Sequence, residues 1–350
     1  MTIGLAIIEP AAGRPDYAHG PRNLESVHLL RISVTDRCNL RCFYCMPDGG
    51  ATFFDRNDLL HANQILAVAK SARQAGIKHF KVTGGEPTLR PDLIEIIEGL
   101  AALKPEDLSM TTNGVTLKKL ALDLKRAGLA RLTISIDSLK PDRYCWIVGN
   151  DRYGLDDLWS GIDAATAAGF ERLKINVVVL GGFNDDEVVD FARLSLDRPW
   201  TIRFIEYMPL GQSRNLEHGL DQAQHTIVDN AEVMGRIEQH CGPLSPVNRA
   251  TELGVGPAQV YRLAGARGRL GFISAMSQPF CETCNRLRLT ARGELRACLF
   301  DGGEVDIRGL LDGPGEPDPN ALIEQMARCV AQKPLVHSER GNRAMSQMGG

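Results

Sequence analysis

The chain has 350 residues, of which 43% are hydrophobic and 24% charged, and its 40 Lys and Arg residues nearly balance 43 Asp and Glu residues. This composition excludes a disordered or fibrous protein, and a net charge of -3 argues against binding to nucleic acid or a membrane through bulk charge. The length suits about two domains. Because no apolar stretch could span a bilayer and residues 1–15 lack a cationic leader region, we expect a cytoplasmic protein.

Six short segments rich in β-branched residues alternate with segments whose apolar residues recur every three or four positions. The alternation predicts a parallel sheet covered by helices. The predicted strands are residues 29–35, 78–83, 108–112, 131–137, 173–180 and 201–207. Because six right-handed βα units fall short of the eight that close a barrel, we expect an α/β fold with a partial, open (βα)6 barrel.

The alternation ends near residue 209. Beyond it, polar segments, a second group of cysteines and a stretch rich in Gly, Pro and Asp replace the regular pattern. The predicted organisation is an N-terminal extension at 1–28, a barrel domain at 29–209 and a smaller C-terminal α+β domain at 210–350.

Six of the nine cysteines fall into two tight groups, which favours metal ligands over disulfides in a chain without a secretion signal. Cys38, Cys42 and Cys45 follow the first predicted strand, at the edge where parallel βα folds place their active sites. Three thiolates can bind three irons of a 4Fe-4S cluster and leave the fourth iron open. Structural zinc takes four ligands, and no fourth Cys or His occurs before His61, which disfavours zinc.

The second group is Cys281, Cys284 and Cys298. Apolar and basic residues alternate over 286–289 and a turn follows at 292–293, so a hairpin is expected to return Cys298 beside Cys284. The spacing alone favours a cluster and a zinc site equally, because Cys-x2-Cys is typical of zinc sites. Four residues are candidates for a fourth zinc ligand: His240, Cys241, Cys329 and His337.

The sequence around the first group, residues 33–47, resembles the cluster loop of radical S-adenosylmethionine enzymes. In that family the open iron binds the methionine part of S-adenosylmethionine, and reduction releases a 5'-deoxyadenosyl radical. The resemblance implies that Tyr44 lies near the adenine and that Gly84-Gly85-Glu86-Pro87, after the second strand, holds the methionine amine. Asn113 and Asp137 follow later strands, where a helix cap or a loop residue explains them equally well.

Residues 278–288, around the second group, resemble the second-cluster motif of the GTP 3',8-cyclase family of molybdenum cofactor biosynthesis, and the resemblance extends from about residue 31 to residue 350. It favours a cluster over zinc at this group. It implies a lyase with two 4Fe-4S clusters and S-adenosylmethionine as cofactors. The implied reaction converts GTP to (8S)-3',8-cyclo-7,8-dihydroguanosine 5'-triphosphate, with the guanine ring at the second cluster.

The resemblance also assigns site residues. Its implied GTP contacts are Arg31, Lys81, Thr111, Lys174, Arg203, Arg286 and Arg288. Its implied cofactor contacts are Tyr44, Gly84, Gly85, Glu86, Ser135 and Met208. Lys81 stands where the family often has arginine, so it keeps the charge but lacks the bidentate fork. Gly349 and Gly350 are implied to reach into the active site and assist catalysis, where composition alone suggests a frayed tail.

The implied partners are a low-potential electron donor such as flavodoxin or ferredoxin and a downstream cyclic pyranopterin monophosphate synthase, and a homodimer is left open. Two other functions are alternative hypotheses for this sequence. Another two-cluster radical enzyme, such as a peptide-modifying one, shares the first loop but does not explain the Arg286-Leu287-Arg288 run or the terminal Gly-Gly pair. A zinc-stabilised RNA-binding module is opposed by the pI of about 6.3 and by the position of the first cysteines after a strand.

Overall fold

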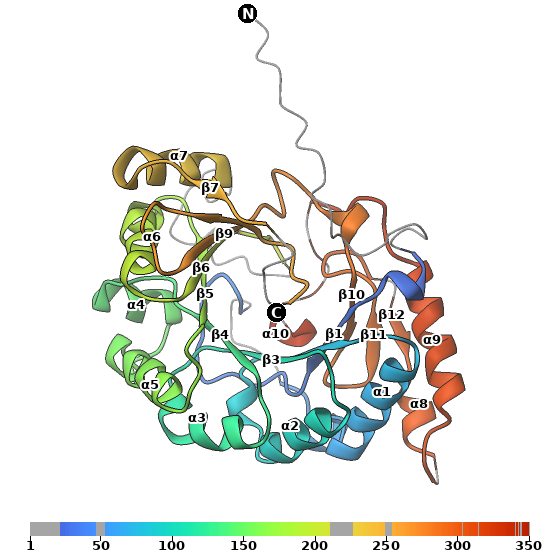
Figure 1. The fold of residues 1–350 in the computed structure, drawn as a ribbon. Coiled ribbons are helices and arrows are strands. Elements are labelled where there is room, and N and C mark those ends of the chain that lie inside the picture. Colours follow the sequence, from blue (N-terminus) through green and yellow to red (C-terminus); the bar gives the residue numbers. More distant parts are fainter. Residues whose placement is uncertain are drawn as a thin grey trace, which may run out of the picture.

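The fold is a curled sheet with helices on its outer side. The computed structural model describes residues 22–46, 53–210, 227–248, 254–302, 304–313, 315–339, 341, 343 and 345–349. Within these residues, twelve strands form one sheet in the order β12-β11-β10-β1-β2-β3-β4-β5-β6-β9-β8-β7. Figure 1 shows that the sheet curls round, with its helices on the outside.

The six predicted strands form the middle of this sheet. They are β1 (Leu29–Ser33), β2 (His79–Thr83), β3 (Asp107–Thr112), β4 (Arg131–Ser135), β5 (Lys174–Val179) and β6 (Thr201–Glu206). Each pairs in parallel with the next. The predicted α/β fold with six βα units is therefore confirmed, and each strand end lies within two residues of its predicted position.

Helices connect these strands and cover the outer face of the sheet (Figure 1). They are α1 (Ala62–Gln74), α2 (Leu93–Ala102), α3 (Leu117–Arg126), α4 (Pro141–Val148), α5 (Leu155–Ala167) and α6 (Val188–Asp197). Their apolar stripes pack against the sheet in one hydrophobic core. Gly76, Gly128 and Gly169, just after three of these helices, have φ angles of 93°, 97° and 91°, the left-handed conformation that ends a helix before the next strand begins.

The C-terminal part of the chain extends the parallel sheet at both edges. Strand β9 (Arg269–Ile273) pairs in parallel with β6, and β10 (Arg286–Leu289) pairs in parallel with β1. Eight neighbouring strands of the described chain are thus parallel, two more than the sequence predicts. Because strands from both sides of residue 210 share one sheet, the domain boundary placed there stays a prediction.

Antiparallel strands and further helices complete the C-terminal part. The expected hairpin is present: β10 pairs with β11 (Glu294–Arg296), and β12 (Glu304–Asp306) follows at that edge. The opposite edge is formed by β7 (Ser245–Pro246) and β8 (Gln259–Arg262). The helices here are α7 (Asn230–Cys241), α8 (Arg308–Leu311), α9 (Pro319–Ala331) and α10 (Met345–Met348). None of the helices in the described ranges is long and apolar enough to cross a membrane.

Close packing between α3 and α5 gives a test of the fold. Gly161 lies inside α5, where an added Cβ would come within 2.1 Å of the Gly114 backbone oxygen. We expect Gly161→Ala to lower the free energy of unfolding by about 1–3 kcal/mol, since the helix must move away from that carbonyl. The matched control is Gly235→Ala inside α7, where no atom lies within 4 Å of the added Cβ, and this change should stabilise by about 0.5–1 kcal/mol. Urea unfolding measures both, and a Gly161→Ala protein as stable as the control variant would contradict the packing.

Candidate functional site

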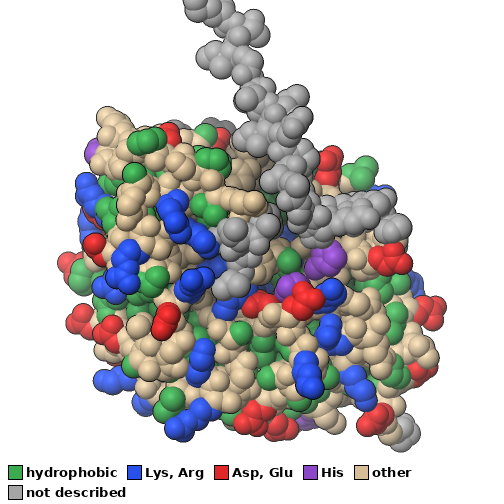
Figure 2. Space-filling view, viewed as in Figure 1, with side chains coloured by type: hydrophobic (Ala, Val, Ile, Leu, Met, Phe, Trp, Pro, Cys, Tyr) green, Lys and Arg blue, Asp and Glu red, His purple; other side chains and the backbone are tan. Residues whose placement is uncertain are grey.

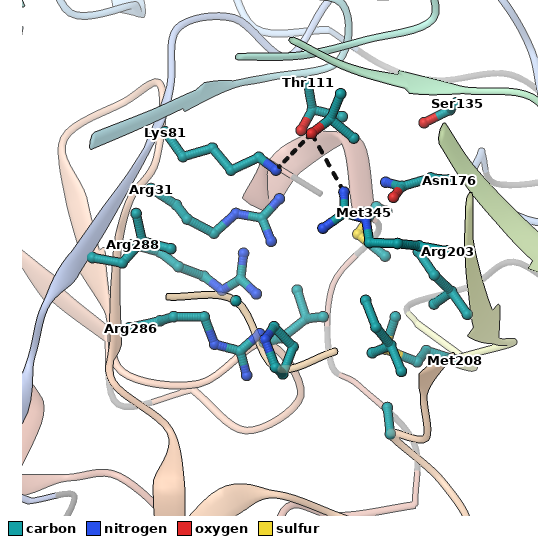
Figure 3. Close-up of a pocket in the computed structure, with 18 of the residues that line it drawn as sticks. Arg31, Lys81, Thr111, Ser135, Asn176, Arg203, Met208, Arg286, Arg288 and Met345 are labelled. Atoms are coloured by element: carbon teal, nitrogen blue, oxygen red, sulfur yellow. Dashed lines mark hydrogen bonds between the residues drawn. The ribbon is translucent and has the colours of Figure 1, made fainter. Parts of the chain in front are cut away.

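A cavity of about 320 Å³ lies inside the curled sheet. All eight parallel strands contribute to its lining, through side chains that alternate along each strand, such as Asp107, Ser109 and Thr111 on β3. Figure 3 shows Arg31, Lys81, Arg203 and the β10 arginines directed into this space. Except for the terminal glycines, every residue predicted from the sequence lines the cavity: Arg31, Cys38, Cys42, Tyr44, Cys45, Lys81, Gly84, Gly85, Glu86, Thr111, Ser135, Lys174, Arg203, Met208, Cys281, Cys284, Arg286, Arg288 and Cys298.

The two cysteine groups lie at opposite ends of this cavity. The first group follows the C-terminal end of β1, whereas Cys281 and Cys284 precede β10. Strands β1 and β10 are parallel, with Leu29 beside Arg286, so Cys284 lies beside position 27. Position 27 is six residues before Ser33, the end of β1 after which the first group begins. Six residues of strand span about 20 Å. The space between the groups can therefore hold a ligand larger than a single ring.

The loop of the first group is held against the Gly84-Gly85 turn. The backbone N–H of Gly85 donates to the Thr35 oxygen at 2.7 Å, and that of Glu86 donates to the Arg37 oxygen at 2.7 Å. A Cβ on Gly85 would lie 2.4 Å from the Arg37 oxygen, so the close approach requires glycine. The motif thus positions the cysteine loop by its backbone.

The Glu86 carboxylate is buried and ties the ends of β2 and β3 together. It accepts hydrogen bonds from the Thr112 hydroxyl and the Asn113 backbone N–H, each at 2.7 Å, and from the hydroxyl and backbone of Thr88. Burial raises its pKa. These bonds give Glu86 a structural role in addition to the amine contact predicted for it.

Asn113 and Asp137, which the sequence left undecided, both contact the first cysteine loop. The Asn113 amide donates to the Asn39 side chain at 2.8 Å and lies 4.0 Å from the Cys38 sulfur. The Tyr44 hydroxyl donates to Asp137 at 2.5 Å, and burial raises the pKa of Asp137 to about 6. The hydrogen bond fixes the ring of Tyr44 at the end of β4.

Two cations lie beside Cys284 of the second cysteine group. The Arg286 guanidinium and the Lys333 ammonium each lie 3.5 Å from the Cys284 sulfur. Burial alone raises the pKa of the Cys284 thiol, but the charges of Arg286 and Lys333 more than offset it, so that the pKa falls to about 6. Sequence reasoning missed Lys333, because a single lysine after a helix is ordinarily a solvated surface charge.

Two of the four candidates for a fourth zinc ligand, His337 and Cys329, have other surroundings in the structure. Both ring nitrogens of His337 lie against backbone oxygens, of Ala275 at 2.8 Å and of Ser338 at 2.7 Å. Cys329 is fully buried in the hydrophobic core. Neither side chain is placed to complete a zinc site at the second group.

The middle of the cavity is strongly cationic. Within the described ranges, no carboxylate forms an ion pair with Arg31, Lys81, Arg203 or Arg288. Burial lowers the pKa of Lys81, and the nearby charges of Arg203 and Arg31 lower it further. Burial also lowers the pKa of Arg203 to about 10 and that of Arg288 to about 9. Buried charges without counterions are costly, so this arrangement favours an anionic ligand.

Several buried polar atoms beside these cations also lack a hydrogen-bond partner. They are the Nε atoms of Arg31 and Arg203, the Thr111 hydroxyl and the Asn176 side-chain oxygen. Figure 2 shows basic and acidic side chains interspersed over the face in view, whereas the cations named above line the cavity. The unpaired atoms and the cations together provide donors and acceptors for a polar, anionic molecule.

The thiols of the two groups fit iron–sulfur clusters. Each group brings three cysteines to the lining of the cavity. Burial, followed by the charge of Glu86, raises the pKa of Cys38 to about 11, and burial raises that of Cys42, so a metal is needed to hold these sulfurs as thiolates. Within the described residues, no three His, Cys, Asp or Glu side chains converge on one point as a single ion requires. A cubane does not require such convergence, since each thiolate binds a different iron.

The C-terminal segment docks beside the cavity. Gly349 does not line the cavity itself, but its oxygen accepts a hydrogen bond at 3.3 Å from Arg288, which does. Gly349 has a φ of 72°, and an added Cβ would lie 2.7 Å from both Ser33 and Thr83. Met348 is buried against Leu210 and Phe300. Gly350 lies outside the described residues.

Comparisons with known proteins identify the family of the chain. Residues 32–195 match the Radical SAM superfamily, and residues 200–339 match the family described as Molybdenum Cofactor Synthesis C. The chain belongs to the radical S-adenosylmethionine enzymes, a class whose members use a 4Fe-4S cluster and S-adenosylmethionine.

Its relatives define the family more narrowly. Proteins named GTP 3',8-cyclase from Moorella thermoacetica and Pelotomaculum thermopropionicum are 46% and 42% identical to it over 330 residues, and each alignment covers 93% of this chain and 98% of the relative. The chain therefore belongs to the GTP 3',8-cyclase family.

A solved structure shares the fold at greater distance. Streptococcus suis SuiB, bound to the precursor peptide SuiA, has a TM-score of 0.57 and 14% sequence identity, with 90% of this chain and 66% of that chain covered. At this identity the likeness concerns the fold alone. It does not favour the peptide-modifying hypothesis, and family membership opposes that hypothesis and the RNA-binding one.

Because Arg203 and Arg288 form no ion pair with a carboxylate of the described residues, we predict that the cavity binds a polyphosphate even without a nucleoside. We expect inorganic tripolyphosphate to bind, and Arg288→Ala or Arg203→Ala to weaken binding by about 1.5–3 kcal/mol, the scale of a hydrogen bond to a charged group. Isothermal titration calorimetry measures the affinity. The control is Arg193→Ala, which removes an exposed arginine of α6 that pairs with Asp190. Equal affinity in the Arg288 and Arg193 variants would exclude Arg288 from the anion site.

Proposed function

We propose that this chain is a GTP 3',8-cyclase, which converts GTP to (8S)-3',8-cyclo-7,8-dihydroguanosine 5'-triphosphate in the first step of molybdenum cofactor biosynthesis. The observation that carries the proposal is one cavity with three cysteines at each end. Between them lie Arg31, Lys81, Arg203 and Arg288, which form no ion pair with a carboxylate of the described residues. Family membership at 46% identity supports it. A nucleoside triphosphate has the length and the charge that such a cavity requires.

The first cysteine group and the loops beside it form the cofactor site of this proposal. Cys38, Cys42 and Cys45 would hold the first 4Fe-4S cluster. Tyr44, fixed by Asp137, would contact the adenine of S-adenosylmethionine, and the remaining cofactor contacts would come from Gly84, Gly85, Glu86, Ser135 and Met208. When bound, the cluster and S-adenosylmethionine supply the oxidant that removes the hydrogen atom from C3' of the ribose.

The second cysteine group and the cations form the substrate site. Cys281, Cys284 and Cys298 would hold a second 4Fe-4S cluster, next to which the guanine ring binds. The triphosphate would lie among Arg31, Lys81, Lys174, Arg203, Arg286 and Arg288, with Thr111 as a further polar contact. These fixed side chains orient the ribose so that C3', after losing its hydrogen, forms a bond to C8 of the guanine.

The reaction requires partners outside this chain. One electron must reach the first cluster for the cleavage of S-adenosylmethionine, and a further electron and a proton must reach the nucleotide after the new bond forms. We therefore propose a low-potential donor such as flavodoxin or ferredoxin. The product then serves as the substrate of a cyclic pyranopterin monophosphate synthase.

Turnover by the reconstituted chain tests the proposal directly. After anaerobic loading with iron and sulfide, incubation with S-adenosylmethionine, a reductant and GTP should give a nucleotide of cyclised connectivity, identified by mass spectrometry and NMR. ATP should not be converted, since adenine lacks the O6 and N1–H of guanine. Equal conversion of ATP and GTP, or no conversion of either by a fully loaded chain, would count against this function.

The two cysteine groups should have separable roles. We expect wild-type protein to hold about eight irons per chain, and Cys42→Ala to abolish reductive cleavage of S-adenosylmethionine. Cys284→Ala should retain cleavage but stop GTP conversion, because its defect lies at the opposite end of the cavity. Iron analysis and 5'-deoxyadenosine formation measure these outcomes. Identical behaviour of both folded variants would contradict the division of roles.

The docked tail should affect the reaction without affecting the clusters. Gly349→Ala places a Cβ within 2.7 Å of Ser33 and Thr83, so the tail must shift. We expect unchanged iron content and about a hundredfold slower cyclisation, the effect of a misplacement of about 1 Å at a reacting centre. Gly309→Ala, with no atom within 4 Å of the added Cβ, is the control and should cyclise at the wild-type rate. A wild-type rate in Gly349→Ala would show that the tail is dispensable.

A further inference from the structure

Lys333 is an unusual feature of the second cysteine group. It follows the C-terminal end of α9, and only 3% of the residue is exposed. Its ammonium donates to the backbone oxygen of Arg286 at 2.6 Å and to that of Cys284 at 2.9 Å, and it lies 3.5 Å from the Cys284 sulfur. In the described part of the chain, none of the ion pairs includes Lys333. Its charge is therefore not neutralised by a carboxylate.

The two carbonyl contacts have a structural explanation that does not require a charge. The oxygen of Asn285 accepts from the backbone of His28 and Leu29, so the oxygens on either side of it, at Cys284 and Arg286, face away from β1. Strand β11 does not satisfy them, because its pairing with β10 begins at Arg288. A neutral donor such as an amide could fill this position, whereas a buried ammonium adds a cost of desolvation. The charge is explained by the third contact, to the thiol.

We propose that Lys333 is a positioning residue that raises the reduction potential of the second cluster through Cys284. The inference rests on the proposed function, since it requires a cluster at this group. One-electron reduction adds a negative charge to a cluster and its thiolates. A fixed ammonium beside a ligand sulfur stabilises the reduced form more than the oxidised form, and hydrogen bonds to the sulfurs are among the factors that set cluster potentials.

The hydrogen bonds at Cys38 of the first group contrast with those at Cys284. The Cys38 sulfur accepts from the backbone N–H of Leu40 at 3.4 Å and lies 4.0 Å from the Asn113 amide, both of which are neutral donors. The Cys284 sulfur has two cationic neighbours, Lys333 and Arg286. The chain thus provides cationic donors to a sulfur at the end of the cavity where the substrate base is proposed to bind.

The test isolates the second cluster in the full chain. Replacing Cys38, Cys42 and Cys45 by Ala leaves one site for about four irons. In this background, Lys333→Met should load the same iron as the parent chain but have a lower midpoint potential in an EPR-monitored titration with a low-potential reductant. At a fixed potential we expect the ratio of reduced to oxidised cluster to fall about tenfold, which is about 59 mV for a one-electron couple. Lys333→Gln, which keeps a donor but no charge, should shift the potential in the same direction by less.

A matched control and three outcomes decide whether Lys333 sets the reduction potential of the second cluster. Lys81→Met removes another lysine of the same cavity, one that bonds Thr133, and should shift the potential clearly less than Lys333→Met. An unchanged potential in fully loaded Lys333→Met overturns the proposal. Loss of iron from both Lys333 variants also overturns it, because the lysine is then needed to assemble the hairpin. If the parent chain with Lys333 intact cannot load about four irons, the second cluster itself is refuted, and this inference with it.

Discussion

The parallel pairing of β10 with β1 is the constraint on which the site depends. It joins segments more than 250 residues apart in the sequence, with Leu29 beside Arg286. Since the first cysteine group follows β1, whereas Cys281 and Cys284 precede β10, parallel alignment places the groups at opposite ends of the cavity. An antiparallel pairing would bring both groups to the same end and leave no room for a substrate between them. The direction of one strand pair therefore determines the length of the ligand that the cavity can hold.

The alternation of side chains along the parallel strands determines what lies between these ends. Every second residue of a strand faces the inside, and on β1, β2, β6 and β10 those positions hold Arg31, Lys81, Arg203 and Arg288. The residues between them face the helices and form the apolar core. A register shift of one residue would exchange the two sets, burying charge in the core. The hydrophobic packing of the barrel and its capacity to bind an anion are therefore fixed by the same register.

The local pattern of the sequence predicts the six βα units because each strand and each helical stripe is encoded within its own segment. Pairing between distant segments is not encoded in this way. Nothing in the local sequence of 269–273 indicates that it borders β6, so the two additional parallel strands could not be predicted. The same limit applies to the site. Motifs with fixed spacing identify the cysteines and Gly84-Gly85, whereas Lys333 belongs to no motif and is brought to Cys284 only by the packing of α9.

Asn113 and Asp137 show a second limit to the prediction of functional residues from sequence. Both residue types are common at helix caps and in loops, so sequence alone gives no reason to prefer a functional role. Only the contacts with Asn39 and Tyr44 show that they support the first cysteine loop. Their contribution depends on neighbours that are distant in sequence, as it does for Lys333.

The cations that line the cavity have a consequence for how a charged ligand approaches the protein. A net charge of -3 gives the chain as a whole no attraction for a polyanion, whereas Arg31, Lys81, Arg203 and Arg288 line one cavity. Fields from exposed charges fade within about 8 Å at physiological ionic strength, whereas enclosed charges are screened far less. Electrostatic attraction should therefore act on a nucleotide close to the mouth of the cavity, where the lining cations focus the field, and not from a distance.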